Sequence, residues 1–219
     1  MEPTAPINRR RLATRGRAWA QALARGLAST GVKPNQISVA SIVAAIGGAI
    51  AFGAASGRAG RQAAVMLLLA AVGIQLRLLC NMLDGLLAIE GGLKTKTGDL
   101  YNEVPDRIAD VALLIGAGYA FQGYAWGVTF GWTAAMLAVL TAYVRLLGGS
   151  LGLRQDFVGP MAKQHRMFTL TLGALGAAVE VVVRGSTSVL AIALALIIVE
   201  SGVTLFRRLI RISHALESQ

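Results

Sequence analysis

The sequence predicts an all-α integral membrane protein with six transmembrane helices and an N-terminal interfacial amphipathic helix. Of its 219 residues, 55% are hydrophobic and only 15% are charged, and the mean hydropathy is +0.60. A helix that crosses a bilayer needs about 20 mostly apolar residues. Six stretches approach that length, at residues 36–56, 62–83, 107–123, 126–148, 167–184 and 187–206. This composition excludes an ordinary soluble globular domain.

The N-terminal 33 residues are basic and carry apolar residues among the arginines. Trp19, Leu23 and Leu27 stand at helical spacing there, which is typical of an amphipathic helix that lies in the membrane interface. The sequence LFRRLIRISHAL near the C-terminus has the same mixture. We therefore divide the chain into a basic interfacial amphipathic segment at 1–33, a six-helix membrane domain at 34–210 and a cytoplasmic tail at 211–219. A solvated basic tail is the alternative interpretation at both ends.

The basic residues predict the orientation of the chain in the membrane. The net charge is +10, and sixteen of the 21 Lys and Arg residues fall in the N-terminal segment, in the connections at 84–107 and 149–166, and after residue 206. Because cytoplasmic loops carry the excess of Lys and Arg, both termini should be cytoplasmic. The basic residues are not interleaved with aromatic residues, so anionic membrane lipid is the expected partner and nucleic acid is excluded.

Polar residues form two rows at the predicted cytoplasmic ends of the second and third helices. They are Arg77, Asn81 and Asp84 in the first row, and Asn102, Asp106 and Asp110 in the second. Their spacings of three and four residues place each row on one helix face. Carboxylates in or beside the hydrocarbon are costly unless they bind cations, pair with bases or line water.

The residue types in these rows are the ligands that a hard cation prefers. Carboxylate and amide oxygens suit Mg²⁺ or Mn²⁺ better than nitrogen or sulfur ligands would. Gly85 and Gly98 lie beside the rows and let a ligand approach the backbone closely. A cation, glycines and nearby basic residues together predict a phosphate or pyrophosphate ligand at the cytoplasmic face.

These residues resemble the signature of the integral-membrane CDP-alcohol phosphotransferases, which is D-x-x-D-G-x-x-A-R-x8-G-x3-D-x3-D. The chain keeps every spacing, and the residues that match are Asp84, Gly85, Ala88, Gly98 and Asp106. Three positions differ, since Asn81, Ile89 and Asn102 replace the first aspartate, the arginine and the third aspartate. The stretches VKPNQIS and MAKQHRMFTL also resemble parts of the family pattern, so the resemblance covers roughly the whole chain.

The resemblance implies a metal-dependent phosphatidyltransferase of phospholipid biosynthesis in the cytoplasmic (inner) membrane of a bacterium. Such an enzyme transfers the phosphoalcohol group of a CDP-alcohol lipid donor, such as CDP-diacylglycerol, to a hydroxyl acceptor and releases CMP. It implies a homodimer with Mg²⁺ or Mn²⁺ as cofactor. Asp106 would be the general base that takes the proton of the acceptor hydroxyl.

The resemblance also assigns the other site residues. The metal ligands would be Asp84, Asp106, Asn81, Asn102 and, as a replacement for a lost aspartate, Asp110. Residues near the nucleotide would be Gly85, Ala88 and Gly98. Phosphate oxygens of the donor or of an anionic acceptor would meet Arg145, Lys163 and Arg166.

Other interpretations stay open at this point. Asp106 and Arg107 could simply cap the third helix, with Pro105 in its first turn and Asn102 near the N-cap, and Asp84 could pair with Arg77. The substituted aspartates favour a second hypothesis, a catalytically silent relative that binds lipid or nucleotide as a membrane scaffold. A transporter is a third, although the sequence has no pair of broken helices in inverted repeats.

Overall fold

The computed structural model describes residues 18–90, 97–121, 126–153, 159, 161 and 163–218, and this part of the chain is helical. Seven helices make up these ranges. They are α1 (Ala18–Ser29), α2 (Pro34–Ala55), α3 (Gly60–Glu90), α4 (Gly98–Tyr119), α5 (Gly127–Ser150), α6 (Lys163–Val183) and α7 (Ser188–Glu217). The all-α class predicted from composition is confirmed.

Within the described ranges, five helices are long and apolar enough to cross a membrane: α2, α3, α5, α6 and α7. The sequence predicted six, and the difference is α4, whose first half carries Asp99, Glu103, Asp106 and Asp110. The apolar stretch predicted at 107–123 begins inside a longer helix, because α4 begins at Gly98 and contains Pro105 inside it. Capping by Asp106 and Arg107, with Asn102 near the N-cap, is wrong, since all three lie beyond the first turn and the N-cap is Thr97.

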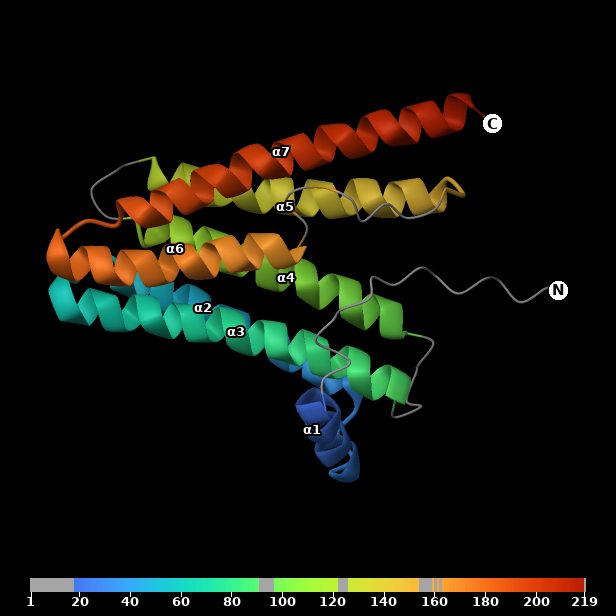
Figure 1. Cartoon of the computed structure of the whole chain (residues 1–219), viewed down its shortest axis with the longest axis horizontal. Helices are drawn as coiled ribbons and strands as arrows, with labels where there is room; N and C mark the ends of the chain where they lie inside the picture. The colour runs from blue at the N-terminus through green and yellow to red at the C-terminus, as the bar shows by residue number, and fades with distance from the viewer. Residues whose placement is uncertain are drawn as a thin grey trace.

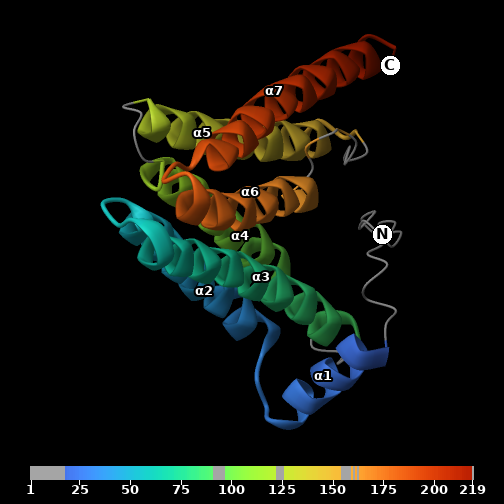
Figure 2. The same cartoon turned by 60° about the vertical axis from the view of Figure 1, so that its left-hand side comes forward.

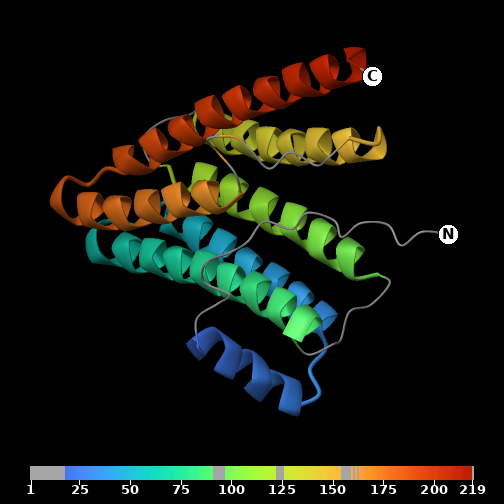
Figure 3. The ribbon, with the colours of Figure 1, turned by 45° about the vertical axis from the view of Figure 1, so that its right-hand side comes forward.

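The helices α2 to α7 form a closed ring in which each one packs against two others. The order around the ring is α2, α3, α6, α7, α5 and α4, and α4 then returns to α2. Consecutive helices run in opposite directions along the long axis, α4 among them (Figure 1). As a result, α3, α5 and α7 end at the same end of the bundle where α4 and α6 begin (Figures 1 and 3).

Helix α1 lies outside the ring, against the last turns of α3 (Figure 2). Ala20 and Ala24 are buried and pack with Leu83 and Leu87 of α3, whereas Trp19 is 51% exposed. The short N-terminal helix predicted from the amphipathic pattern is thus present from residue 18 onward. Residues 1–17 lie outside the described part. Helix α7 continues to Glu217, past residue 211, where the sequence placed the start of the tail.

Close contacts between small residues hold neighbouring helices of the ring together. A Cβ atom added at Gly73 of α3 would lie 2.7 Å from the Cα of Gly48 on α2. One added at Gly116 of α4 would lie 2.7 Å from the Cα of Ala49. Small residues of this kind are typical of membrane helix interfaces, because they let two backbones approach.

Replacing Gly73 with alanine should therefore lower the stability of the protein by about 1–3 kcal/mol, because the added methyl forces α2 and α3 apart. Gly47 offers a matched control on α2, since nothing lies within 4 Å of the position of its Cβ. Gly47→Ala should be neutral or stabilising by up to about 1 kcal/mol, the helix propensity difference. SDS-induced unfolding followed by circular dichroism measures both, and equal effects of the two variants would contradict the packing argument.

Candidate functional site

Buried charged side chains gather where α3 ends and α4 begins. Among the described residues six charged side chains are buried, each 6% exposed or less. They are Arg77, Asp84, Asp106, Asp110, Arg166 and Arg208. Burying a charge is costly unless it is paired and hydrogen-bonded. The contacts of these six residues therefore define the site.

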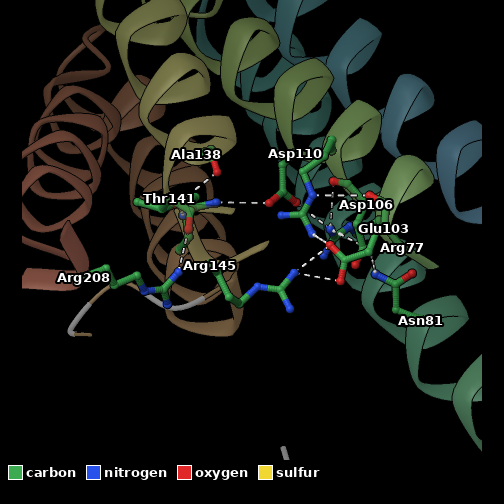
Figure 4. Close-up of polar contacts among 11 residues, drawn as sticks. Arg77, Asn81, Glu103, Asp106, Asp110, Ala138, Thr141, Arg145 and Arg208 are labelled. Carbon is green, nitrogen blue, oxygen red and sulfur yellow. Dashed lines mark hydrogen bonds and ion pairs between the residues drawn. The ribbon is translucent and has the colours of Figure 1, made fainter. Parts of the chain in front are cut away.

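Asp106 of α4 is held by two donors from α3. Nη2 of Arg77 lies 3.3 Å from Oδ1 of Asp106, and Nδ2 of Asn81 donates to the same oxygen at 2.8 Å. Figure 4 shows Asn81 and Arg77 directed toward Asp106 from α3. The rows predicted from spacing thus face each other, as expected. The two helix backbones have few direct contacts, so these long side chains bridge the space between them.

Asp110, one turn further along α4, binds two arginines. Its Oδ1 accepts a hydrogen bond from Nη2 of Arg77, and its Oδ2 accepts one from Nη1 of Arg166 at 3.1 Å. The pairing of Arg77 with Asp84, left open by the sequence, is thus not the arrangement seen: Arg77 pairs with Asp106 and Asp110. Each oxygen of the Asp110 carboxylate is therefore already engaged by a guanidinium group.

The buried network continues across the ring through Thr141 of α5. Nη2 of Arg166 donates to the Thr141 hydroxyl at 3.1 Å, and Nη1 of Arg208 on α7 donates to the Thr141 carbonyl at 2.6 Å. Sequence analysis assigned no role to Thr141 or Arg208. The signal that could have found Arg208 is its spacing from Ser201 and Thr204, which places three polar residues on one face of an apolar helix.

Asp84 is linked to α2 at the same end of the bundle. The hydroxyl of Ser38 donates to its Oδ2 at 2.7 Å, and both side chains are buried. Ser38 closes the stretch VKPNQIS that resembled a family pattern, but the sequence indicated no partner for it. The stretch positions it by starting α2: Pro34 is the first helical residue, and Gln36 accepts a hydrogen bond from the Lys33 amide at 2.9 Å.

A second group of charges is half-buried beside this network. Arg145 of α5 contacts both carboxylate oxygens of Glu103, at 2.7 and 2.6 Å, and Arg107 contacts Oε2 of Glu103 at 2.8 Å. Figure 4 shows Arg145 reaching from α5 to Glu103 on α4. The side chains of Arg145 and Glu103 are 10% and 27% exposed. Arg145, which we expected to meet phosphate oxygens, therefore already has an anionic partner.

The remaining predicted residues lie around this end of the bundle. Gly85 and Ala88 are half-buried on α3. Gly98 is the half-buried first residue of α4, and Asn102 is exposed one turn before Asp106. The side chains of Lys163 and Ile89 lie outside the described part of the structure.

The donor set can be tested against the predicted Mg²⁺ or Mn²⁺. Its oxygen ligands are of the right chemical type. Across the described ranges, however, no group of three His, Cys, Asp or Glu side chains converges as metal ligands do. Asp106 and Asp110 are surrounded by N–H donors of Arg77, Asn81 and Arg166, whereas a cation requires acceptors. In this arrangement the residues do not fit a divalent cation held between Asp106 and Asp110.

The sequence matches several curated proteins, although no protein-family model matches it. It is 28% identical over 162 residues to a phosphatidylinositol phosphate synthase of Mycobacterium marinum. The matched region covers 69% of this chain and 62% of that protein. It is 30% identical over 105 residues to the enzyme of the same name from Mycobacteroides abscessus, and this match covers 43% of this chain and 44% of that enzyme. The inner membrane protein YnbA of Escherichia coli K12 is 28% identical to it over 115 residues, and this match covers 52% of this chain and 56% of YnbA. The chain thus spans less than two thirds of the length of these relatives.

The fold matches solved structures over most of the chain. A crystal structure of the phosphatidylinositol phosphate synthase of Mycobacterium tuberculosis with CDP-DAG bound has a TM-score of 0.74 at 24% identity, covering 88% of this chain and 92% of that one. A structure of the same enzyme with manganese and citrate has a TM-score of 0.73 at 24% identity, covering 88% of both chains.

Fold and site together define a helical integral membrane protein with a buried charge network at one end of its bundle. The chain is a distant homologue of the phosphatidylinositol phosphate synthases and of YnbA, which are members of the CDP-alcohol phosphatidyltransferase family. The family resemblance predicted from the spaced signature is thus confirmed as a distant homology.

Proposed function

We propose that the protein transfers a phosphatidyl (phosphoalcohol) group from a CDP-alcohol such as CDP-diacylglycerol to a hydroxyl acceptor and releases CMP. The observation that carries the proposal is the position of Asp84 and Asp106. Both are buried at the same end of the bundle, where they occupy kept positions of the spaced signature. Distant homology to phosphatidylinositol phosphate synthases supports it.

In this proposal Asp106 is the general base. The acceptor hydroxyl attacks the phosphorus that carries the lipid alcohol, its proton passes to the Asp106 carboxylate, and the pyrophosphate bond breaks to release CMP. Arg77 and Asn81 orient the carboxylate from one side. The two donors fix the orientation of the carboxylate, so the acceptor hydroxyl has to approach it in one direction.

Basic side chains would bind the phosphates. Arg166 is fixed by Asp110 and Thr141, so its charge is held in place before substrate arrives, which favours binding of a charged transition state. We assign Arg145 and Lys163 to phosphate oxygens of the donor or an anionic acceptor. Gly85, Ala88 and Gly98 are assigned to the nucleotide side of the site.

The membrane arrangement completes the proposal. Helix α4 has 22 residues, about 33 Å at 1.5 Å per residue, and it runs antiparallel to α3 and α5, the helices before and after it in the chain (Figure 1). We propose that it is a sixth membrane pass, with its charged face turned into the ring, in an inner membrane of a bacterium. Both termini and the site would then be cytoplasmic, and the protein would be a homodimer.

Reconstituted protein tests the proposal directly. Proteoliposomes would receive labelled CDP-diacylglycerol and a panel of polyols and polyol phosphates, in parallel with Mg²⁺, with Mn²⁺ and with EDTA. Release of labelled CMP that depends on one acceptor supports the proposal and identifies the acceptor. No CMP release with any acceptor under all three conditions contradicts it. The EDTA arm tests the predicted need for a divalent cation.

A catalytically silent lipid- or nucleotide-binding scaffold is the second candidate. It is favoured by the substitutions at Asn81 and Asn102 and by the guanidinium groups that neutralise Asp106 and Asp110. Restoring both aspartates, as Asn81→Asp with Asn102→Asp, separates the two. A lost active site should gain CMP release, whereas an adapted enzyme should lose it.

The pair between Glu103 and Arg145 gives a further prediction. Glu103→Gln should lower the KM for an anionic acceptor by about two- to fivefold, because it releases a partly exposed ion pair worth about 0.2–1 kcal/mol. The kcat should stay unchanged. Asp99→Asn is the matched control, since Asp99 is exposed on the first turn of the same helix. A loss of thermal stability with an unchanged KM would show instead that the pair only fastens α4 to α5.

A further inference from the structure

Arg77 is the most deeply buried charged residue of the site. The residue is 0% exposed, and one nitrogen, Nη2, makes its contacts to Asp106 and Asp110. Within the part of the chain that the structure describes, its Nε and Nη1 have no hydrogen-bond partner. A buried guanidinium with unsatisfied N–H groups is costly. We therefore ask what Arg77 does at this position.

The surroundings of Asp106 show what Arg77 replaces. A divalent cation at Asp106 requires oxygen acceptors around it, but the groups directed at Oδ1 are N–H donors of Arg77 and Asn81. Arg77 also contacts Asp110, one turn away on the same face. The guanidinium thus lies between the two α4 carboxylates, in the place where a cation bound by both would lie.

The net charge of the six buried charged residues also argues against a bound divalent cation. Among the described residues, the three buried carboxylates, Asp84, Asp106 and Asp110, are matched by three buried guanidinium groups. The network is therefore neutral without any added ion. A divalent cation that entered with Arg77 still in place would leave a net charge of +2 in a region of low dielectric constant, which is strongly unfavourable.

We propose that Arg77 is the resident counter-cation of the α4 carboxylates, so that a divalent cation binds at Asp106 only if it displaces the guanidinium. The proposal rests on the site of the proposed function, but it does not require turnover. A binding measurement and the CMP-release assay can therefore fail independently. It assigns to Arg77 a role in limiting divalent-cation binding, and Asn81 reinforces that role by donating to the same oxygen of Asp106.

Direct titration of the full chain with Mn²⁺ in detergent tests the proposal, with free Mn²⁺ read by electron paramagnetic resonance. Arg77→Met removes the charge, and we expect it to bind Mn²⁺ at least about tenfold more tightly than the unaltered protein, because two buried carboxylates lose their counter-ion. Arg77→Lys keeps the charge and should bind as weakly as the unaltered protein. Arg61→Met is the matched control, because Arg61 is an exposed arginine at the other end of the same helix.

Two results would overturn the proposal. The first is an Arg77→Met protein that elutes as a folded species, retains its helical circular dichroism and binds Mn²⁺ no more tightly than the unaltered protein. The second needs no change at Arg77. Asp106→Asn should leave the Mn²⁺ affinity unchanged while Arg77 is present, so a loss of about tenfold would show that Asp106 is already a metal ligand. This second measurement decides the question even if Arg77→Met does not fold.

Discussion

Asp106→Asn should reduce acceptor-dependent CMP release by about 10²- to 10⁴-fold, the usual contribution of a general base. The asparagine side chain has nearly the same shape, and its carbonyl can still accept the hydrogen bonds that Arg77 and Asn81 donate to Oδ1. The protein should therefore fold and bind the donor while it loses the group that takes the proton. Single-turnover release of labelled CMP measures the effect on the chemical step.

The matched control for this change is Asp99→Asn. Asp99 lies on the same helix, in its first turn and two turns before Asp106, and is exposed, so its variant should retain the activity of the unaltered protein. If Asp106→Asn kept more than about a tenth of the activity, a general base worth 10²-fold or more would have to be sought elsewhere. Equal losses in the two variants would indicate a nonspecific effect of charge on α4.

Asp110→Leu should have the largest effect on stability, lowering the free energy of unfolding by about 3–5 kcal/mol. Asp110 is 1% exposed and accepts hydrogen bonds from both Arg77 and Arg166. Its removal leaves two buried guanidinium groups without the carboxylate that separates their charges. SDS-induced unfolding followed by circular dichroism gives the free energy difference.

A double-mutant cycle identifies the cause of that loss. Arg166→Met removes one of the two guanidinium groups, so the double variant Asp110→Leu with Arg166→Met should be more stable than the sum of the single effects predicts. Asp99→Leu is the control at an exposed site and should change the stability by no more than about 0.5 kcal/mol. Additive single effects would mean that the contact between Asp110 and Arg166 contributes little.

The sequence was sufficient for properties that depend on one helix at a time. Runs of apolar residues set the helices, because about 20 residues are needed to cross a bilayer. The spacing of Arg77 and Asn81, and of Asp106 and Asp110, fixed which residues share a face. Helix α4 shows the limit of this approach. Hydropathy counts Asp106 and Asp110 as polar wherever they point, so it found only the apolar stretch at 107–123 and could not indicate that both are buried.

Partners across the bundle were decided only by the tertiary structure. Arg77 and Asp84 are seven residues apart on one helix, yet Arg77 extends to Asp106 and Asp110 and Asp84 accepts a hydrogen bond from Ser38. Such pairs follow from which helices are neighbours in the ring, and that order depends on close contacts such as the one between Gly48 and Gly73. The amino-acid sequence by itself thus determined the helical membrane class and the end where the site lies. The balance of charge within the site arose only when five helices, α3 to α7, brought their arginines and carboxylates together.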